Sequence, residues 1–367
     1  MIEKLIIGQD IEYIKKLYSD VLYKIHSQGP VDSADFEKLA YIKKFHPDVF
    51  SIRESELMYL MGLFYKINAP KDLIEKAYSL FADEIFETTG NTFTPVQADA
   101  YQNIKEKTFF SFSAPTSAGK SFLFRELIVN ATNDIIIVVP SRALVAEYIN
   151  AVKELVNNTV LVLQFIDNVN ILKTTRRVFI ITPERGAELF EYKSIFDIEL
   201  FLFDEAQLSE EEVRGIRFDA FVRRVAKEFP KATKVFAHPY VQNPSAQIEK
   251  HHFPLECSAA VSYEQNSVGK IYVSINKNKM CYFSPFIDNG KNQVPVNEDI
   301  ISSILSKKGS ILVYSSKSKL YSKAYIEEYG KYLRLCPPLE DPNAKKYIEQ
   351  LREYIGATDE SGKKVSF

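Results

Sequence analysis

Two apolar runs, each followed by a polar segment of defined chemistry, constrain the fold of this chain more than any other feature. The first run, Phe109–Ser113, leads into the loop Ala-Pro-Thr-Ser-Ala-Gly-Lys-Ser at residues 114–121. The second run, Leu200–Phe203, leads into Asp204-Glu205-Ala206-Gln207. A strand that enters such a loop and a helix that leaves it form the context that a phosphate-binding loop requires. The sequence therefore predicts an α/β fold with a nucleoside triphosphate site at the strand ends.

The loop offers the groups that a triphosphate needs. Small residues let backbone N–H groups turn inward onto an anion. Lys120 is predicted to meet the β- and γ-phosphates as a point charge, and Ser121 to place its hydroxyl on Mg²⁺. The residues predicted to surround the nucleotide phosphates are Ala114, Pro115, Thr116, Ser117, Ala118, Gly119, Lys120 and Ser121. Ala114 stands where the common pattern has its first glycine.

The acidic segment supplies the complementary chemistry. Asp204 is predicted to hold Mg²⁺ together with Ser121, and Glu205 to orient and deprotonate an attacking water. Gln207 is counted with these catalytic residues, although its amide cannot titrate. A simpler explanation of an acidic pair at a strand end is a helix N-cap with a solvated neighbour. The order of strand, loop, helix and acidic strand favours the nucleotide site.

The chain divides into three regions that differ in their pattern of apolar residues. Residues 1–90 show apolar residues at a 3.6-residue period, which predicts an all-helical accessory domain. Residues 91–256 alternate apolar runs with helical patterns, which predicts a parallel sheet buried on both faces. Residues 257–367 predict the start of a second α/β domain. The strands predicted for the middle region are 109–112, 135–139, 160–163, 178–181, 200–203 and 234–237.

The third region carries weaker signals. Strands are predicted at Ile271–Ile275 and Cys281–Phe283, and a helix at Asp299–Leu305. The apolar run Ile311–Tyr314 predicts a further strand, and Ser315–Tyr329 a further helix.

Composition limits the partners of the chain. Its 46 Lys and Arg residues nearly balance its 48 Asp and Glu residues, so any nucleic acid would have to bind in a local cleft. Cys257, Cys281 and Cys336 are widely spaced and indicate neither a disulfide framework nor a zinc site, which fits a reducing cytoplasm. The sequence shows no apolar stretch of membrane-spanning length and no signal-peptide pattern, so no membrane partner is predicted.

From Phe93 to Tyr314 the motifs resemble superfamily 2 helicases of the DExH/DEAD-box type, closest to the superkiller-type branch. The segment Phe93-Thr94-Pro95-Val96-Gln97 resembles their adenine-recognition segment, in which Phe93 stacks on the base and Gln97 reads its Hoogsteen edge. The alternative is that Pro95 merely starts a helix at its first turn. The resemblance implies a RecA-like domain at 91–256 that uses ATP and Mg²⁺.

Two further segments resemble the family's contacts to a nucleic-acid backbone. These are Pro140-Ser141-Arg142 and Thr182-Pro183-Glu184-Arg185, each just past a predicted strand. Arg142 and the amides that follow it could meet a phosphate, and an ordinary helix cap is the alternative for that segment. Because neither segment reads base edges, the resemblance implies sequence-independent binding of single-stranded DNA or RNA.

The chain departs from the family pattern in three places. Gln207 stands where relatives have His or Asp, and Ala237-His238-Pro239 stands where they have Ser-Ala-Thr. No segment after Phe283 resembles the motifs that supply the second-sheet arginine finger. We therefore expect an N-terminal portion of a helicase, or a natural short form, with weak or absent ATP turnover.

Two readings of the biological role follow. The first is an ATP-dependent helicase or translocase, and the alternative is a nucleotide-gated module whose helical region recruits a protein partner. The helical lead-in followed by this motif set also resembles the helicase subunit of the Hachiman anti-phage system, which implies a role in antiviral defence.

Overall fold

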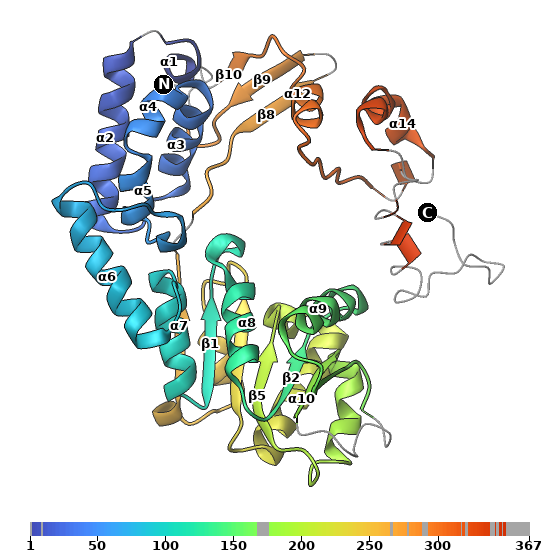
Figure 1. Ribbon diagram of the computed structural model, residues 1–367. Coiled ribbons are helices and arrows are strands. Elements are labelled where there is room, and N and C mark those ends of the chain that lie inside the picture. Colours follow the sequence, from blue (N-terminus) through green and yellow to red (C-terminus); the bar gives the residue numbers. More distant parts are fainter. Residues whose placement is uncertain are drawn as a thin grey trace.

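The computed structural model describes residues 2–337 except 9, 167–175, 265–266, 277–278, 288–292, 317 and 320–321, together with a few residues between 342 and 349. It contains an N-terminal helical region, a parallel sheet with helices on both faces, and a small antiparallel sheet (Figure 1). This confirms the predicted fold class up to the end of the parallel sheet. The prediction for the end of the third region, residues 350–367, lies outside the described residues.

The helical region follows from its capping residues and its apolar period. The side chains of Asp10, Asp32 and Asp72 each accept a hydrogen bond from a backbone N–H in the first turn of the following helix. The last long helix ends at Gly90, whose φ of 74° suits a residue without a Cβ. The elements of this region are α1 (Ile2–Ile7), α2 (Ile11–Gln28), α3 (Ser33–Phe45), α4 (Pro47–Ile52), α5 (Glu54–Leu60), η1 (Phe64–Lys66) and α6 (Leu73–Thr89).

The parallel sheet has seven strands in the order β3-β4-β2-β5-β6-β1-β7. Every neighbouring pair in it is parallel, so the carboxyl ends of all its strands lie at one edge. The six predicted strands are confirmed. The strands are β1 (Phe109–Ser113), β2 (Asp134–Val138), β3 (Val160–Leu163), β4 (Arg176–Ile181), β5 (Ile198–Phe203), β6 (Thr233–His238) and β7 (Ser258–Ser262).

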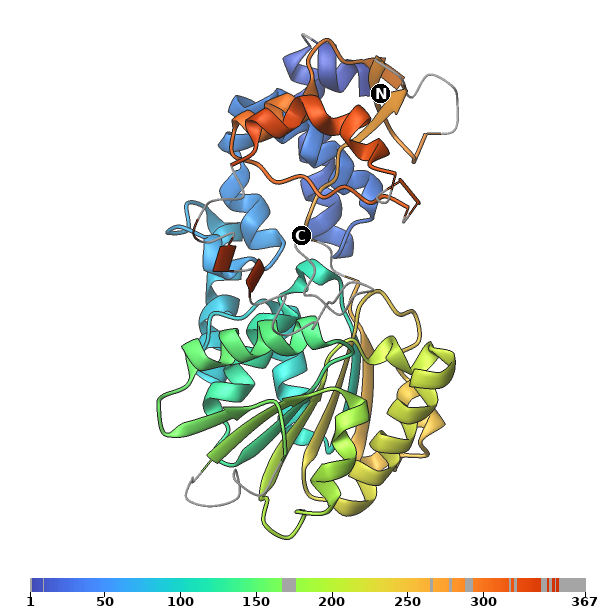
Figure 2. The same ribbon diagram turned by 90° about the vertical axis from the view of Figure 1, so that its right-hand side faces the viewer.

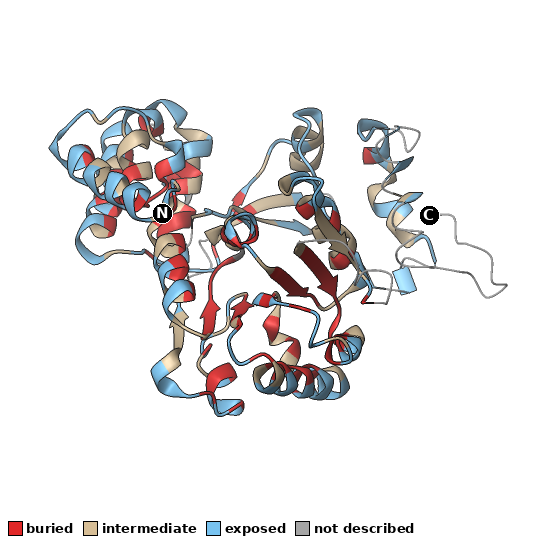
Figure 3. Ribbon diagram, turned by 60° about the horizontal axis from the view of Figure 1, so that its bottom comes forward, coloured by how far each residue is buried: buried red, intermediate tan, exposed pale blue. Residues whose placement is uncertain are grey.

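Successive strand residues pack into separate layers on the two faces of the sheet. In β2, Ile135 and Ile137 contact the layer that includes α7, α8 and α9, whereas Ile136 and Val138 contact the layer that includes α10. Both layers are apolar, which explains why the strands read as uninterrupted apolar runs. Figures 2 and 3 show the helices on both sides of the sheet and the buried strands between them. The covering elements are α7 (Pro95–Glu106), α8 (Lys120–Asn130), α9 (Arg142–Leu155), η4 (Pro183–Phe190), α10 (Glu212–Glu228) and α11 (Ala246–Lys250).

The parallel sheet extends past residue 256, where the sequence analysis ends the second region. Strand β7 pairs with β1 in register, from Phe109 opposite Ser258 to Ser113 opposite Ser262. Its sequence, Ser-Ala-Ala-Val-Ser, has small residues and is only half-buried, as befits an edge strand. This strand was not predicted, because its sequence lacks a strong apolar run.

The small sheet differs from the start of a second parallel sheet that the sequence predicts. Strands β8 (Tyr272–Asn276), β9 (Lys279–Phe283) and β10 (Gln293–Pro295) form an antiparallel sheet in the order β10-β9-β8. Only two residues connect β8 to β9, and a connection that short allows an antiparallel pair but no parallel crossover. The strands at Ile271–Ile275 and Cys281–Phe283 are therefore real, but their predicted arrangement is wrong.

This sheet packs on the N-terminal helices. Tyr282 and Val294 are buried in the same apolar cluster as residues of α1 to α5, and the Tyr282 ring meets the ring of Phe45 edge-on at 5.5 Å. Figure 1 shows β8, β9 and β10 beside α1 and α3. The first and third regions of the sequence thus share one core.

The predicted strand at Ile311–Tyr314 does not form. This segment has no regular secondary structure, and Leu312 and Tyr314 are 97% and 100% exposed. The described elements around it are α12 (Ile300–Ser306), α14 (Ala324–Tyr329) and η7 (Gly330–Leu335). Part of the predicted helix Ser315–Tyr329 lies outside the described residues.

None of the described helices combines the length and the apolar character needed to cross a membrane.

A buried ion pair joins two strands of the parallel sheet. Asp134 of β2 accepts hydrogen bonds from the backbone N–H of Arg177 at 2.7 Å and from its Nη1 at 3.0 Å. Both residues are less than a tenth exposed. Arg177 therefore has a structural role, because it ties β4 to β2.

We predict that Asp134→Ala lowers the free energy of unfolding by about 3–5 kcal/mol, because it leaves a buried guanidinium without its carboxylate. Urea denaturation followed by circular dichroism measures the change. The control Asp20→Ala removes an exposed carboxylate of α2 and should change stability by less than about 0.5 kcal/mol. Equal stability of the two variants would contradict the role assigned to the ion pair.

Candidate nucleotide site

The loop after β1 has the shape of a phosphate-binding loop. A short helix, η2 (Thr116–Ala118), turns the chain, Gly119 adopts a left-handed φ of 79°, and α8 begins at Lys120. The Lys120 ammonium donates to the carbonyl oxygens of Ala114 at 2.7 Å and Pro115 at 3.4 Å. Ser121 is exposed in the first turn of α8. The loop thus presents a cation and a hydroxyl at the start of a helix, where anions bind.

The acidic segment after β5 lies close to this loop. Burial lowers the pKa of Lys120, and the negative charges of Asp204 and Glu205 partly offset that effect. Strand β6 separates β1 from β5, so the two polar segments flank its carboxyl end. The structure therefore brings Lys120, Asp204 and Glu205 together, as the sequence predicts.

Glu205 is held in an uncommon backbone conformation. Its φ of 54° and ψ of 46° lie in the left-handed region, which costs a residue with a Cβ about 1–3 kcal/mol. The Gln207 amide donates a hydrogen bond to its carboxylate. The Gln207 amide cannot transfer a proton, but its hydrogen bond fixes the position of the Glu205 carboxylate.

Asp204 has a partner that the sequence analysis missed. The Tyr148 hydroxyl on α9 donates to its Oδ2 at 2.6 Å, and the Glu205 N–H donates to its Oδ1 at 3.1 Å. Burial raises the pKa of Asp204 and the Glu205 charge adds to this, although the Tyr148 hydrogen bond opposes it. The inward spacing of Leu144, Val145 and Tyr148 on α9 was the available signal, but only the fold pairs this tyrosine with Asp204.

The residues present fit a magnesium ion. Hydroxyl and carboxylate oxygens are ligands that Mg²⁺ accepts, and each Asp204 oxygen retains a lone pair beyond its one hydrogen bond. Within the described parts of the chain, no cluster of three or more His, Cys, Asp or Glu side chains could hold a metal. Ser121 and Asp204 would thus be the protein ligands of the ion. Beside phosphates, Mg²⁺ usually has only one or two protein ligands.

Gln97 ties the loop to the start of α7. Its Oε1 accepts from the Thr94 N–H at 2.9 Å, and the Thr94 hydroxyl accepts from the Gln97 N–H at 3.3 Å, which makes a reciprocal capping box. Its Nε2 donates to the carbonyl of Gly119 at 3.1 Å. A Cβ on Gly119 would lie 2.2 Å from that Nε2, so glycine is needed here for space as well as for its φ. Pro95 occupies the first turn of α7, so the helix-start explanation is also realised.

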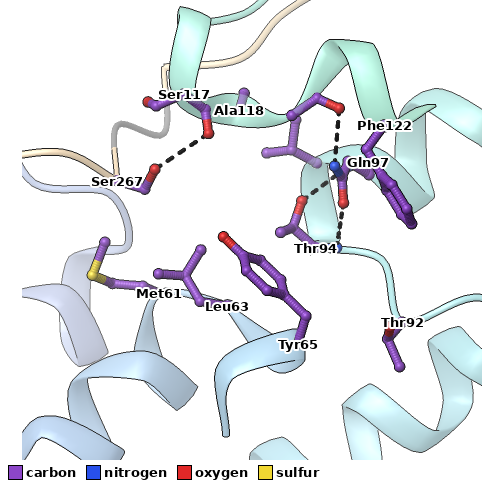
Figure 4. Close-up of a pocket in the computed structure, with 12 residues that line it drawn as sticks. Met61, Leu63, Tyr65, Thr92, Thr94, Gln97, Ser117, Ala118, Phe122 and Ser267 are labelled. Atoms are coloured by element: carbon purple, nitrogen blue, oxygen red, sulfur yellow. Dashed lines mark hydrogen bonds between the residues drawn. The ribbon is translucent and has the colours of Figure 1, made fainter. Parts of the chain in front are cut away.

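A pocket of about 430 Å³ opens beside Gln97 and the loop. Figure 4 shows the loop on one side of it and the chain after α5 on the other. Its walls come from four segments of the chain and are mainly apolar. The lining residues are Met61, Leu63, Tyr65, Thr92, Thr94, Val96, Gln97, Ser117, Ala118, Gly119, Phe122 and Ser267.

The structure does not place Phe93 in this pocket. Phe93 is fully buried, and its ring packs against Tyr101 at 5.3 Å and edge-on against Phe122 at 5.7 Å. The aromatic side chains that reach the pocket are Tyr65 and Phe122, which are 58% and 39% exposed. Phe93 thus packs against Phe122, and neither of the two rings that line the pocket was predicted from the sequence.

The first predicted nucleic-acid segment lies at the start of α9. The Ser141 hydroxyl accepts from the Leu144 N–H at 3.3 Å and caps the helix, while Arg142 is exposed at its first residue. Arg214 of α10 donates to the carbonyl of Pro140. The helix-cap alternative therefore holds for Ser141, and Arg142 keeps its side chain in solvent.

The second predicted segment is linked to the first. Arg214 Nε lies 3.0 Å from Glu184 Oε1, so one guanidinium contacts both segments. Thr182 and Pro183 are buried at the start of η4. Arg185 donates to the carbonyl of Gln164 at 3.4 Å, and its guanidinium lies over the ring of Phe165. Arg214 was not predicted, because its pairing with Glu184 depends on the packing of α10.

Comparison with known proteins identifies the middle of the chain. Residues 94–238 match the family described as DEAD/DEAH box helicase. These residues form a DEAD/DEAH box helicase domain. No curated protein sequence matches the chain significantly.

Two solved structures are similar to parts of the chain. The UvsW helicase from bacteriophage T4 has 15% sequence identity and a TM-score of 0.33, over 46% of this chain and 58% of that one. A hypothetical ATP-dependent RNA helicase from Sulfolobus tokodaii has 15% identity and a TM-score of 0.36, over 50% of this chain and 56% of that one. The chain thus spans less than two thirds of the length of either structure.

The matched segment ends at His238, where the chain departs from the Ser-Ala-Thr pattern. His238 is buried, and its Nε2 lies 3.1 Å from the hydroxyl of Ser111. Because that hydroxyl donates to the carbonyl of Pro244 at 2.7 Å, Nε2 carries the proton and donates to it. Burial, together with the Lys120 charge, lowers the pKa of His238 to about 4. The imidazole is therefore neutral and anchors the end of β6 to β1.

The lowered pKa of His238 makes the free energy of unfolding depend on pH. Its pKa is about 6.5 in the unfolded chain and about 4 in the folded protein, so the unfolded chain binds more protons between these values. The contribution to stability is full above pH 6.5 and is lost as the pH falls toward 4. Replacement by glutamine, which can still donate to Ser111, removes this titration.

We predict that the free energy of unfolding of the parent protein falls more steeply from pH 6.5 to pH 4 than that of His238→Gln, by up to about 3 kcal/mol. Urea denaturation at each pH measures both slopes. His252→Gln, which replaces an exposed histidine, is the matched control. Parallel slopes for the parent and His238→Gln would contradict the assignment of a neutral buried imidazole.

Proposed function

We propose that this chain binds ATP with Mg²⁺ at the carboxyl edge of the parallel sheet and hydrolyses it while it holds single-stranded DNA or RNA. The observation that carries this proposal is the convergence of Lys120 with Asp204 and Glu205, two segments far apart in the sequence. The match of residues 94–238 to DEAD/DEAH box helicases supports the same conclusion.

Each residue of the site has a role that its geometry supports. Lys120 exchanges its contact to the Ala114 carbonyl for the β- and γ-phosphate oxygens of ATP. Glu205, held by Gln207, orients the attacking water and accepts its proton. Gln97 retains one N–H and one lone pair with which to read an adenine. Mg²⁺, when bound by Ser121 and Asp204, would neutralise charge on the phosphates.

Turnover by the chain alone should be slow. Lys120 is hydrogen-bonded to its own loop, and Asp204 to Tyr148, so these contacts must be exchanged before both groups act on a substrate. The alternative function, a nucleotide-gated module that recruits a protein through its helical region, is favoured by His238, because a buried neutral imidazole replaces the hydroxyl groups of the Ser-Ala-Thr pattern.

Nucleic acid should bind along the starts of α9 and η4. Arg142 is exposed there, and Arg214 neutralises Glu184, so that this carboxylate does not repel a phosphate. These contacts would bind the backbone irrespective of base sequence and weaken as salt rises.

The resemblance of the motifs supports a place in the superkiller-type branch and, with the helical lead-in, a role in anti-phage defence. The cysteines Cys257, Cys281 and Cys336 are unpaired, which supports a reducing compartment such as the cytoplasm.

We predict that Lys120→Ala weakens binding of ATP·Mg²⁺ at least about tenfold, because it removes the cation that meets the phosphates. Glu205→Gln should bind ATP normally but hydrolyse it about 10²–10⁴ times more slowly. Calorimetric titration and a phosphate-release assay measure these two effects. Lys153→Ala and Glu154→Gln, on the exposed end of α9, are the matched controls.

Unchanged ATP binding by Lys120→Ala would contradict the proposed site. Multi-turnover hydrolysis that single-stranded DNA or RNA stimulates would support the helicase. Tight ATP binding with no turnover under any of these conditions would support the nucleotide-gated module.

A further inference from the structure

The wall of the pocket opposite the phosphate loop belongs to the helical region. Met61, Leu63 and Tyr65 lie between the end of α5 and η1, outside the matched helicase domain. They face Gly119 and Phe122 across the cavity. In Figure 4 the Tyr65 ring rises from the helical region toward the loop, with its hydroxyl foremost. The pocket therefore exists only where these two parts of the chain meet.

The contact between the two parts is close and well defined. Gly62 has a φ of 65°, and a Cβ at that position would lie 2.4 Å from Cδ of Pro95. The turn is also held by the Tyr59 hydroxyl, which donates to the carbonyl of Asn68 at 2.7 Å. Only glycine allows the backbone to approach the start of α7 this closely.

This contact leads directly to the phosphate loop. Pro95 follows Thr94, whose N–H donates to Gln97, and the Gln97 amide in turn donates to the carbonyl of Gly119. Three adjoining contacts thus connect the turn at Gly62 to Gly119, the N-cap residue of α8. The wall and the loop are positioned against each other by this short series.

The chemistry of the cavity suits a planar base. Its aromatic members are Tyr65 and Phe122, and its remaining walls include the apolar side chains of Met61, Leu63 and Val96. Stacking on an aromatic ring favours any nucleobase, because each base has a π face. Lys66 Nζ lies 5.4 Å from the centroid of the Tyr65 ring, which adds a cation to that side of the ring.

We propose that residues 61–65 form the base-binding wall of the nucleotide site and that Tyr65 contacts the base of the bound ATP. The inference rests on the proposed ATP site and adds to it a residue outside the helicase domain. The phosphates are then held by one part of the chain and the base by another. ATP binding consequently stabilises the packing of the helical region on the helicase domain.

The test compares ligands with and without a base on the full chain. ATP and inorganic triphosphate, each with Mg²⁺, are titrated calorimetrically into the parent, Tyr65→Ala and Tyr65→Phe. Tyr65→Ala should weaken ATP about tenfold and leave triphosphate within about twofold, since only the stacking ring is lost. Tyr65→Phe keeps the ring and should bind both ligands as the parent does. Circular dichroism confirms that each variant is folded.

An exposed tyrosine far from the pocket in the sequence serves as the control. Tyr23→Ala removes a tyrosine of α2 that is 71% exposed, compared with 58% for Tyr65, and should leave both affinities unchanged. If Tyr65→Ala binds ATP as tightly as the parent while Lys120→Ala loses it, the base wall is wrong and the ATP site stands. Equal losses of ATP and triphosphate in Tyr65→Ala would likewise overturn the base contact. If Lys120→Ala also keeps full affinity, the ATP site itself is refuted.

Discussion

All strands of a parallel sheet end at the same edge, and the positions of the loop after β1 and of the acidic segment after β5 depend on this constraint. Strands β1, β5 and β6 have Ser113, Phe203 and His238 as their last residues, and the sheet order places β6 between the other two. Segments far apart in the sequence therefore meet at one edge because the sheet places them there. The apolar packing on both faces of the sheet fixes that edge.

Around this edge the protein satisfies its charged groups internally. Lys120 donates to its own loop, Tyr148 donates to Asp204, and Gln207 donates to Glu205. Each contact avoids the cost of a buried polar group without a partner. In the proposed site, a bound nucleotide would replace the Lys120 contact and a metal ion would replace the Asp204 contact. The polar groups at this edge are consequently engaged with one another in the structure.

The sequence predicted those features that depend on local patterns. Uninterrupted apolar runs predicted the central strands, and the Gly119-Lys120 loop and Asp204-Glu205 pair followed directly from residue type and order. Features that depend on tertiary packing escaped prediction. The edge strand β7 lacks an apolar run, the burial of Phe93 depends on neighbouring rings, and Tyr65 reaches the pocket only because the helical region packs on α7.

The third region shows the same limit more clearly. Its apolar runs predicted strands at β8 and β9, and these strands form, but no periodicity could show that they pack on the N-terminal helices. The segment Ile311–Tyr314 has high strand propensity and yet forms no strand among the described residues. Strand propensity is realised only where a neighbouring strand offers hydrogen bonds and a face to cover.

In the proposed site one nucleotide spans two parts of the chain, and a crystal structure of the full chain with a non-hydrolysable ATP analogue and Mg²⁺ tests this most directly. We predict that the phosphates lie on residues 117–121 beside Lys120, the metal ion on Ser121 and Asp204, and the base between Tyr65 and Phe122. Phosphates bound away from Lys120, or a base outside this pocket, would contradict it.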